Sequence, residues 1–398
     1  MKKPYLIVGS LACALWLAQA QQEEAIRVKQ SDISLVYNQY LQTGDNSAVT
    51  GGIGTERLTI YGPAFSMSHT FGNNIIDFDL GIDVISSAST DNIDFVESSP
   101  SRLDARTYTS LGYSRILEEG RMTVNGGMSA SIESDYTSVG VNFGVVGASK
   151  DRMNTYSAQA QLFFDDLRWG RLQGGFLKPP IGLIYPEELR FREWYDVSNR
   201  NSYNLNLGFS RIIDQRNTFG GFLTLSFQEG LLSTPFHRVY FNDGSLAVEL
   251  LPNERFKAAL TGSWNTFLGG NIILRNSLHG YVDTFSIGSF AIESEAVFKL
   301  NARWNLQPSA RFYMQSASKY FAPFEAHDPS DEFYTSDYDL SEFNSLNLGL
   351  RLSHSPTGRK NGNLANISWQ YYYYGRSNNL AAHTLSMILN FKPKKDSP

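Results

Sequence analysis

Charged side chains lie an even number of residues apart along several stretches of the sequence, a spacing that could hold ions or polar solutes along a wall. Asp77, Asp79 and Asp83 follow this spacing in one stretch, and Arg275 and Asp283 follow it in another. Alternate side chains of an extended chain point to the same face. The pattern therefore predicts rows of charge, in which carboxylates attract cations and guanidinium groups attract anions.

A second row of charges changes sign between stretches that we expect to be neighbouring strands. It consists of Arg275, Glu293, Arg311 and Arg351. Opposite charges on neighbouring strands attract, so one interpretation is an ion-pair ladder that stiffens the wall. The other is a selectivity surface, acidic on the wall of Asp77 and mostly basic on the opposite wall. The two interpretations are compatible.

Polar residues also gather in segments expected to lie at one end of the molecule. They form either a mouth that binds a ligand or a folded-in plug, or a set of anchors that pin loops by hydrogen bonds. We favour the anchors, because a buried loop must satisfy its backbone polar groups. The candidate mouth residues are Asp135, Tyr136, Arg238, Asp243, Asp283 and Asp337.

The segment 319–340 is rich in carboxylates, among them Asp328 and Asp331. Clustered carboxylates can hold Ca²⁺, but the Asp-x-Asp-x-Asp spacing with a glycine is missing. We therefore expect an acidic loop that is solvated, or bridged by divalent ions at a lipopolysaccharide surface. The sequence predicts no metal site and no cofactor.

Enzymatic function is not predicted. The histidines are scattered, and the sequence has no Gly-x-Ser-x-Gly, no His-Glu-x-x-His and no glycine-rich phosphate loop. Nucleic acid is not an expected partner either, because the net charge is -5 and no basic stretch stands out.

Residues 1–20 have the pattern of an export signal. Lys2 and Lys3 precede an apolar run, and Ala18-Gln19-Ala20 matches a small-x-small cleavage site. Cleavage after Ala20 would remove Cys13, the single cysteine, so we expect neither disulfides nor thiolate chemistry in the mature chain. A large exported chain without cysteine is typical of a bacterial envelope protein.

Hydrophobic and polar residues alternate along most of the chain, in stretches of about 10 to 14 residues. Leu346, Leu348 and Leu350, for example, alternate with Asn347 and Gly349. Aromatic residues make up 13% of the chain, which excludes disorder. About sixteen such strands predict an all-β fold, a transmembrane antiparallel up-and-down β-barrel over residues 21–398, porin-like in strand number.

The connections that follow even-numbered strands are all short. Every long connection follows an odd-numbered strand, and outer-membrane barrels show this asymmetry, with short periplasmic turns and long outer loops. An even number of strands then places both termini in the periplasm. The alternative is a soluble β-sandwich or propeller, whose strands would be shorter and whose two ends would be alike. The predicted extracellular loops are 43–54, 87–103, 166–201, 230–253 and 319–340.

Five short stretches carry a family resemblance. The two most specific are Glu133-Ser134-Asp135-Tyr136 and Arg238-Val239-Tyr240-Phe241, and the others are Asp83-Val84-Ile85-Ser86, Phe312-Tyr313-Met314-Gln315-Ser316 and Ser336-Asp337-Tyr338. Over most of its mature length, the chain resembles an outer-membrane family catalogued as domain of unknown function 3570. The resemblance implies an outer-membrane barrel with no established activity. Some relatives are similar to genes found near flavin-transferring enzymes, which implies a link to envelope redox systems.

We therefore expect a channel or small-solute translocation pore in the bacterial outer membrane. The alternative is a structural or partner-binding barrel with a plugged lumen, including one that serves an envelope redox system. Expected partners are the outer-membrane bilayer, lipopolysaccharide, the barrel-assembly machinery and a small solute. The final predicted strand alternates toward Phe391, as assembled outer-membrane proteins do at their C-terminal strand.

Overall fold

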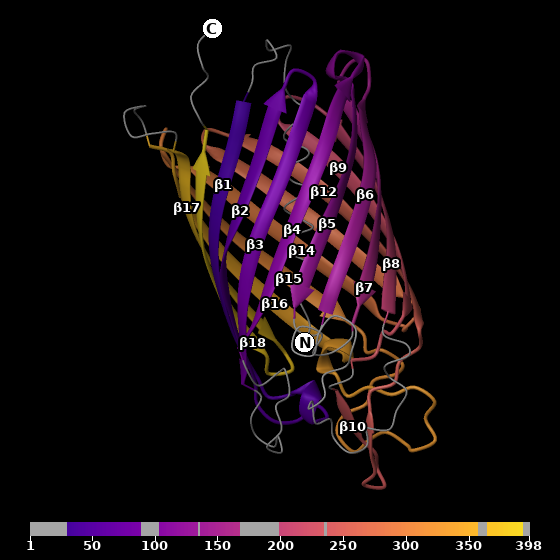
Figure 1. Ribbon diagram of the computed structural model, residues 1–398. Helices are drawn as coiled ribbons and strands as arrows, with labels where there is room; N and C mark the ends of the chain where they lie inside the picture. Colours follow the sequence, from indigo (N-terminus) through magenta and orange to yellow (C-terminus); the bar gives the residue numbers. More distant parts are fainter. Residues whose placement is uncertain are drawn as a thin grey trace.

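The computed structural model describes residues 30–88, 103–133, 136–167, 199–234, 237–356 and 364–392. Within these ranges, sixteen long antiparallel strands close into one barrel (Figure 1). The barrel strands are β1 (Gln30–Gly44), β2 (Glu56–Phe71), β3 (Asn74–Ala88), β4 (Leu103–Leu117), β5 (Met122–Glu133), β6 (Tyr136–Ala148), β7 (Asn154–Asp166), β8 (Asn199–Ile212), β9 (Asn217–Gly230), β12 (Glu254–Gly269), β13 (Ile272–Asp283), β14 (Gly288–Lys299), β15 (Trp304–Gln315), β16 (Phe343–His354), β17 (Leu364–Arg376) and β18 (Ala381–Phe391).

The predicted up-and-down topology is confirmed. Each barrel strand pairs with the barrel strand that follows it in the chain, and β1 closes the ring on β18, with Ile33 opposite Phe391. Alternation did not predict one small hairpin between β9 and β12, because its strands are only three residues long. The hairpin and the described 3-10 turns are β10 (Arg238–Tyr240), β11 (Leu246–Val248), η1 (Ala48–Thr50), η3 (Glu118–Gly120) and η5 (Tyr338–Leu340).

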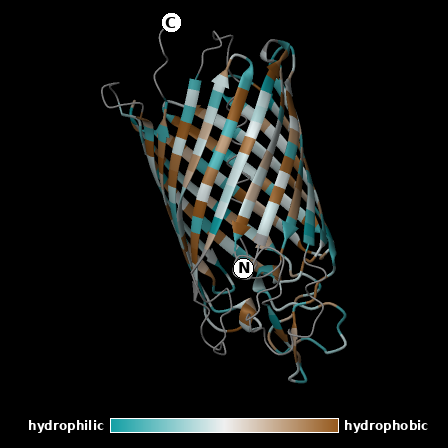
Figure 2. Cartoon of the chain, in the orientation of Figure 1, coloured by the Kyte–Doolittle hydropathy of each residue, from teal (hydrophilic) through white to brown (hydrophobic). Residues whose placement is uncertain are grey.

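The outer surface of the barrel is apolar. Outward-facing side chains such as Phe143 and Leu260 are 63% and 62% exposed. In a water-soluble protein, large apolar side chains of this kind would be buried in the core. Hydrophobic segments recur along the strands in Figure 2. A closed sheet pairs the backbone groups of every strand, so this apolar wall can face lipid without unsatisfied hydrogen bonds. Among the described residues, no helix is long and apolar enough to cross a membrane.

The two ends of the barrel differ. At one end the strands are joined by short turns such as 72–73 and 270–271, and we call this the short-turn end. The opposite end, beside β10 at the bottom of Figure 1, is the long-loop end. Three of the predicted long loops lie there: 43–54, 319–340, and 230–253 apart from residues 235–236, which lie outside the described residues. Most of loops 87–103 and 166–201, and the whole signal segment 1–20, lie outside the described residues.

Candidate functional site

The inward faces of the strands divide the lumen into two halves. The charged half comprises the inward faces of β12 to β17 and of β2 to β4. The strands β18 and β1 lie between these two runs, and their inward faces carry no charge between the rims. The neutral half comprises those of β5 to β9. Between its rims, the described inward-facing residues of the neutral half carry no charge and are mostly serine, threonine, asparagine, glutamine and glycine. At its long-loop rim, Arg200 Nη2 lies 2.7 Å from Asp165 Oδ2.

The predicted acidic row lies on the inward face of β3. Its outward neighbours Leu80 and Ile82 are exposed, so Asp77, Asp79 and Asp83 point into the lumen. Ser110 on β4 donates a hydrogen bond to Asp79 Oδ2 at 2.7 Å. Asp83 lies opposite Arg106 in the register of β3 with β4. In the strand order, β3 lies across the ring from β13, so the acidic row faces the strand of Arg275.

The second row of charges also points into the lumen, and part of the predicted ion-pair ladder is formed. Arg275 Nη1 on β13 donates to Glu295 Oε1 on β14 at 2.8 Å. Glu293 lies directly opposite Arg311 on β15. Arg351 on β16 donates from Nε to Gln370 Oε1 at 3.1 Å. Cross-strand pairing and a charged lumen surface therefore coexist on the same strands.

Aromatic rings in both halves lie against glycines of the neighbouring strand. Tyr108 is paired with Gly81, and Tyr372 with Gly349, in the charged half; Phe163 is paired with Gly140 in the neutral half. A Cβ placed at Gly140 would lie 2.7 Å from the Phe163 ring, and one at Gly349 or Gly81 would collide with the tyrosine ring. These rings therefore lie along the wall, and the missing Cβ is what lets them stay out of the lumen.

Three segments at the long-loop end pack into one body, which we call the loop assembly: residues 45–55, the described part of 231–253, and 316–342. Val239, Phe241, Ala247 and Tyr334 form one buried apolar cluster of this assembly. A second cluster consists of Leu251, Phe285, Ile287 and Leu340, so it also includes the β13–β14 turn. The rings of Tyr240 and Phe324, 4.9 Å apart, join the hairpin to the third segment.

Inward-facing barrel residues anchor the loop assembly at the rim. Asp283, at the end of β13, accepts hydrogen bonds from Arg255 and Tyr281 and from the backbone N–H groups of Phe285 and Ile287. The Asp283 side chain is fully inaccessible to solvent. The turn from β13 to β14 is thus built around one carboxylate.

A second set of anchors holds η5 against the wall. Gln315 at the end of β15 donates from Nε2 to the backbone carbonyls of Asp339 and Ser341. Arg376 at the end of β17 forms an ion pair with Asp339. Because Gln315 and Arg376 point inward, η5 lies at the mouth of the lumen on the side of the charged half.

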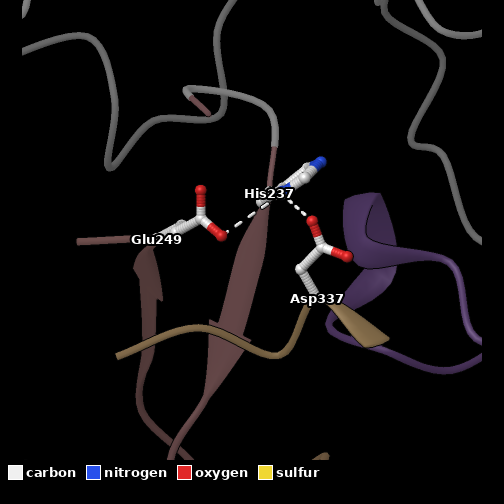
Figure 3. A group of neighbouring side chains, drawn as sticks. All are labelled: His237, Glu249 and Asp337. Carbon is white, nitrogen blue, oxygen red and sulfur yellow. Dashed lines mark hydrogen bonds and ion pairs between the residues drawn. The ribbon is translucent and has the colours of Figure 1, made fainter. Parts of the chain in front are cut away.

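Three buried ionisable side chains meet inside the loop assembly (Figure 3): His237, just before β10, Glu249, just after β11, and Asp337, which precedes η5. His237 Nδ1 lies 3.4 Å from Glu249 Oε1 and 3.5 Å from Asp337 Oδ2. Burial alone would raise the pKa of Glu249, but attraction to His237 and hydrogen bonds from Thr335 and the Thr234 N–H hold it below its usual range. These three side chains could hold a metal ion.

The predicted mouth residues whose side chains the structure describes do not share one surface. Asp283 and Asp337 are buried anchors, whereas Asp243 is exposed in the turn of the hairpin. The hydroxyl and backbone N–H of Ser245 bond to Asp243 and hold the pKa of its carboxyl below the usual range. Arg238 lies in β10, the Tyr136 backbone begins β6, and Asp135 lies outside the described residues.

Sequence reasoning missed four anchors: His237, Glu249, Arg255 and Arg376. The sequence does carry a signal for Arg255 and Arg376. Each carries an inward-facing charge at the long-loop end of an alternating strand, Arg255 beside the long connection from β9 to β12 and Arg376 beside the short connection to β18. His237 and Glu249 lie in a segment without alternation, so no periodic pattern marked them.

The comparisons with known proteins are as follows. Residues 96–393 match the model of a family described as "Protein of unknown function (DUF3570)", which confirms the resemblance; of the quoted stretches, only 83–86 lies outside the match. A search of the curated proteins found no match.

Similar solved structures include several Pseudomonas and Acinetobacter proteins. They are a BenF-like porin from Pseudomonas fluorescens (11% identity, 92% of this chain and 98% of that chain, TM-score 0.41), OpdK with vanillate from Pseudomonas aeruginosa (9%, 91% and 98%, 0.40), and OccAB3 from Acinetobacter baumannii (9%, 92% and 100%, 0.43). What this chain does must be sought in its own residues.

Proposed function

We propose that this chain, which belongs to the DUF3570 family, forms a water-filled channel for small hydrophilic solutes in the bacterial outer membrane. The observation that carries the proposal is the polar inner wall, which continues around all sixteen barrel strands while the outer wall is apolar. A barrel of about this strand number leaves a lumen wide enough for water. The rings of Tyr108, Tyr372 and Phe163 lie against glycines along the wall and so leave that space open.

The charges on the wall support a weak preference for cations. Asp77, Asp79 and Asp83 attract cations along β3, whereas Arg275 across the ring is partly neutralised by Glu295. The charged residues of the whole chain sum to -5. The preference should be largest at low salt and fade as screening shortens toward about 3 Å at 1 M salt.

Purified protein in a planar bilayer tests the proposal. We expect discrete conductance steps and a reversal potential on the cation side in a salt gradient. The variant with Asp77, Asp79 and Asp83 all changed to Asn keeps side-chain size but removes three charges, so its reversal potential should move toward anions. A parent that inserts without conducting would refute the channel. A triple variant that conducts with unchanged selectivity would show that β3 does not line the path.

The packed loop assembly favours a second candidate, a barrel whose lumen is closed at the long-loop end until a partner or solute moves the loops. Its anchors Asp283 and Arg376 point into the mouth rather than away from it. Arg376→Gln would loosen η5 in this case. A silent parent and a conducting Arg376→Gln variant would favour the gated barrel, whereas equal conductance would favour the open channel.

We also propose that the long-loop end faces the cell exterior, against lipopolysaccharide, and that β18 is recognised by the barrel-assembly machinery after export. Cysteines at Glu332 in the loop assembly and at Lys150 in a short turn test the orientation, since both positions are exposed. An impermeant maleimide added to intact cells should label Glu332→Cys and leave Lys150→Cys unlabelled. The reverse pattern would invert the barrel. We propose a role without catalysis, since the described lumen residues hold no recognisable catalytic constellation.

A further inference from the structure

The cluster of His237, Glu249 and Asp337 concentrates negative charge where water cannot reach it. Their exposed fractions are 4%, 1% and 6%. Buried charged groups in proteins are paired or coordinate metal ions, and imidazole nitrogen and carboxylate oxygen are both ligands of transition metals. Three such groups that converge in one buried place therefore make a candidate metal site.

The two distances from His237 match the spacing of ligands around an ion. His237 Nδ1 lies 3.4 Å from Glu249 Oε1, a long hydrogen bond, and 3.5 Å from Asp337 Oδ2. Both distances exceed the range of about 2.7–3.2 Å that is usual for a hydrogen bond. Tetrahedral Zn²⁺ with bonds of about 2.0–2.2 Å places neighbouring ligand atoms about 3.3–3.6 Å apart. All three candidate ligand atoms lie within 4.8 Å of one another.

Neighbouring groups already orient the two carboxylates. Glu249 Oε2 accepts a hydrogen bond from the Thr234 N–H at 2.6 Å, and Oε1 accepts one from Thr335 Oγ1 at 2.5 Å. Asp337 Oδ1 accepts one from the Asp339 N–H at 2.9 Å, which leaves Oδ2 directed at His237. In Figure 3 the three side chains converge from different segments. Such outer contacts are what fix ligands in metal sites.

We propose that His237, Glu249 and Asp337 form a binding site for one divalent transition-metal ion of the Zn²⁺ type. One imidazole nitrogen and two carboxylate oxygens make three protein ligands and leave the fourth position of the tetrahedron to water. The ion ties the β10–β11 hairpin to the segment that carries η5, and so fastens the loop assembly over the mouth. Mg²⁺, which dehydrates reluctantly, and Ca²⁺, which takes about 6–8 oxygen ligands, fit a site with an imidazole ligand less well.

The test uses the full chain purified in detergent with a tag that lacks histidine, stripped with a chelator and titrated with Zn²⁺. We expect one Zn²⁺ per chain, and a Co²⁺-loaded sample with the visible absorption of tetrahedral cobalt. Glu249→Gln and Asp337→Asn should each weaken binding by at least about tenfold, since loss of even an outer contact costs that much. Zn²⁺ should also slow proteolysis of the loops in the parent and not in these variants.

Asp331→Asn is the matched control, because it removes a carboxylate from His327, another buried histidine of the same loop assembly, at 3.0 Å. Its Zn²⁺ affinity should equal that of the parent. Heat-modifiable migration in gels confirms in every variant that the barrel is folded. A folded parent that binds no Zn²⁺, or that binds Ca²⁺ or Mg²⁺ in preference, would overturn the proposal, as would unchanged binding in Glu249→Gln. Binding is measured without conductance, so the result stands apart from the channel proposal.

Discussion

The two halves of the lumen pair their inward-facing polar groups in different ways. The neutral half satisfies its inner wall with amides and hydroxyls, as where Asn206 on β8 accepts from Thr224 and donates to Gln161. The charged half uses cross-strand ion pairs, and its rim holds the loop assembly through buried charges such as Asp283 and Arg376. In the charged half, charge is therefore concentrated where the wall also fastens the loop assembly. Between its rims, the described part of the neutral half closes the barrel with uncharged side chains alone.

Asp283→Ala should have the largest effect on stability. It leaves Arg255 without its buried partner, and breaking a buried ion pair by removing one member costs about 3–5 kcal/mol. Asn206→Ala in the neutral half should cost about 1 kcal/mol, the value of an ordinary hydrogen bond. Urea unfolding of the detergent-folded barrel measures both, and equal losses would erase the contrast between the halves.

A charged residue introduced on the outer wall should destabilise both halves equally, because both outer walls face lipid. Leu348→Arg in the charged half and Leu205→Arg in the neutral half should each cost about 2–4 kcal/mol. Asn347→Arg, whose side chain points into the lumen, should cost far less. Folding yields into lipid vesicles across a denaturant series would decide this. A tolerated Leu205→Arg would mean that the neutral half does not face lipid.

Gly349→Ala should lower conductance, because the added Cβ must displace the Tyr372 ring toward the lumen. The overpacked wall should lose about 1–3 kcal/mol. Gly280→Ala is the control, since Gly280 has no atom within 4 Å of its Cβ position. Adding Tyr372→Ala to Gly349→Ala should restore the conductance. If the double variant conducts no better than the single one, the ring is not what narrows the lumen.

Arg275→Gln should have the smallest effect on stability. The Arg275 side chain is 53% exposed, and ion pairs this open to solvent contribute about 0–1 kcal/mol. Its effect should appear instead in the reversal potential, which should move toward cations. A loss comparable to that of Asp283→Ala would show that the ladder is a main support of the barrel.

The sequence predicts the barrel well because each strand carries its own signal. In β3, Ile76, Phe78 and Leu80 alternate with Asp77 and Asp79. This alternation indicates both that the segment is a strand and which of its faces points into the lumen. Lipid on one side and water on the other impose this pattern residue by residue. The inward-facing candidates could therefore be chosen from the chain alone, whereas their roles remain proposals.

The loop assembly could not be predicted in the same way. His237 and Asp337 are a hundred residues apart and meet only because the hairpin packs on a segment from another pair of strands. No local periodicity links them, and strands of three residues such as β10 and β11 are too short for alternation to show. Contacts of this kind depend on the tertiary arrangement rather than on any local pattern.

The seam between β1 and β18 has a consequence for how the barrel can be made. Ile33 pairs with Phe391, so the ring cannot close until the last strand has been delivered. Until then β1 and the growing end both present unpaired backbone edges, which invite pairing with other chains. Closure of the barrel therefore waits for the pairing of two strands that are far apart in the sequence, and such pairing is slow to form. The chain should depend on a chaperoned, template-assisted route, in which another sheet edge shelters β1 until β18 arrives.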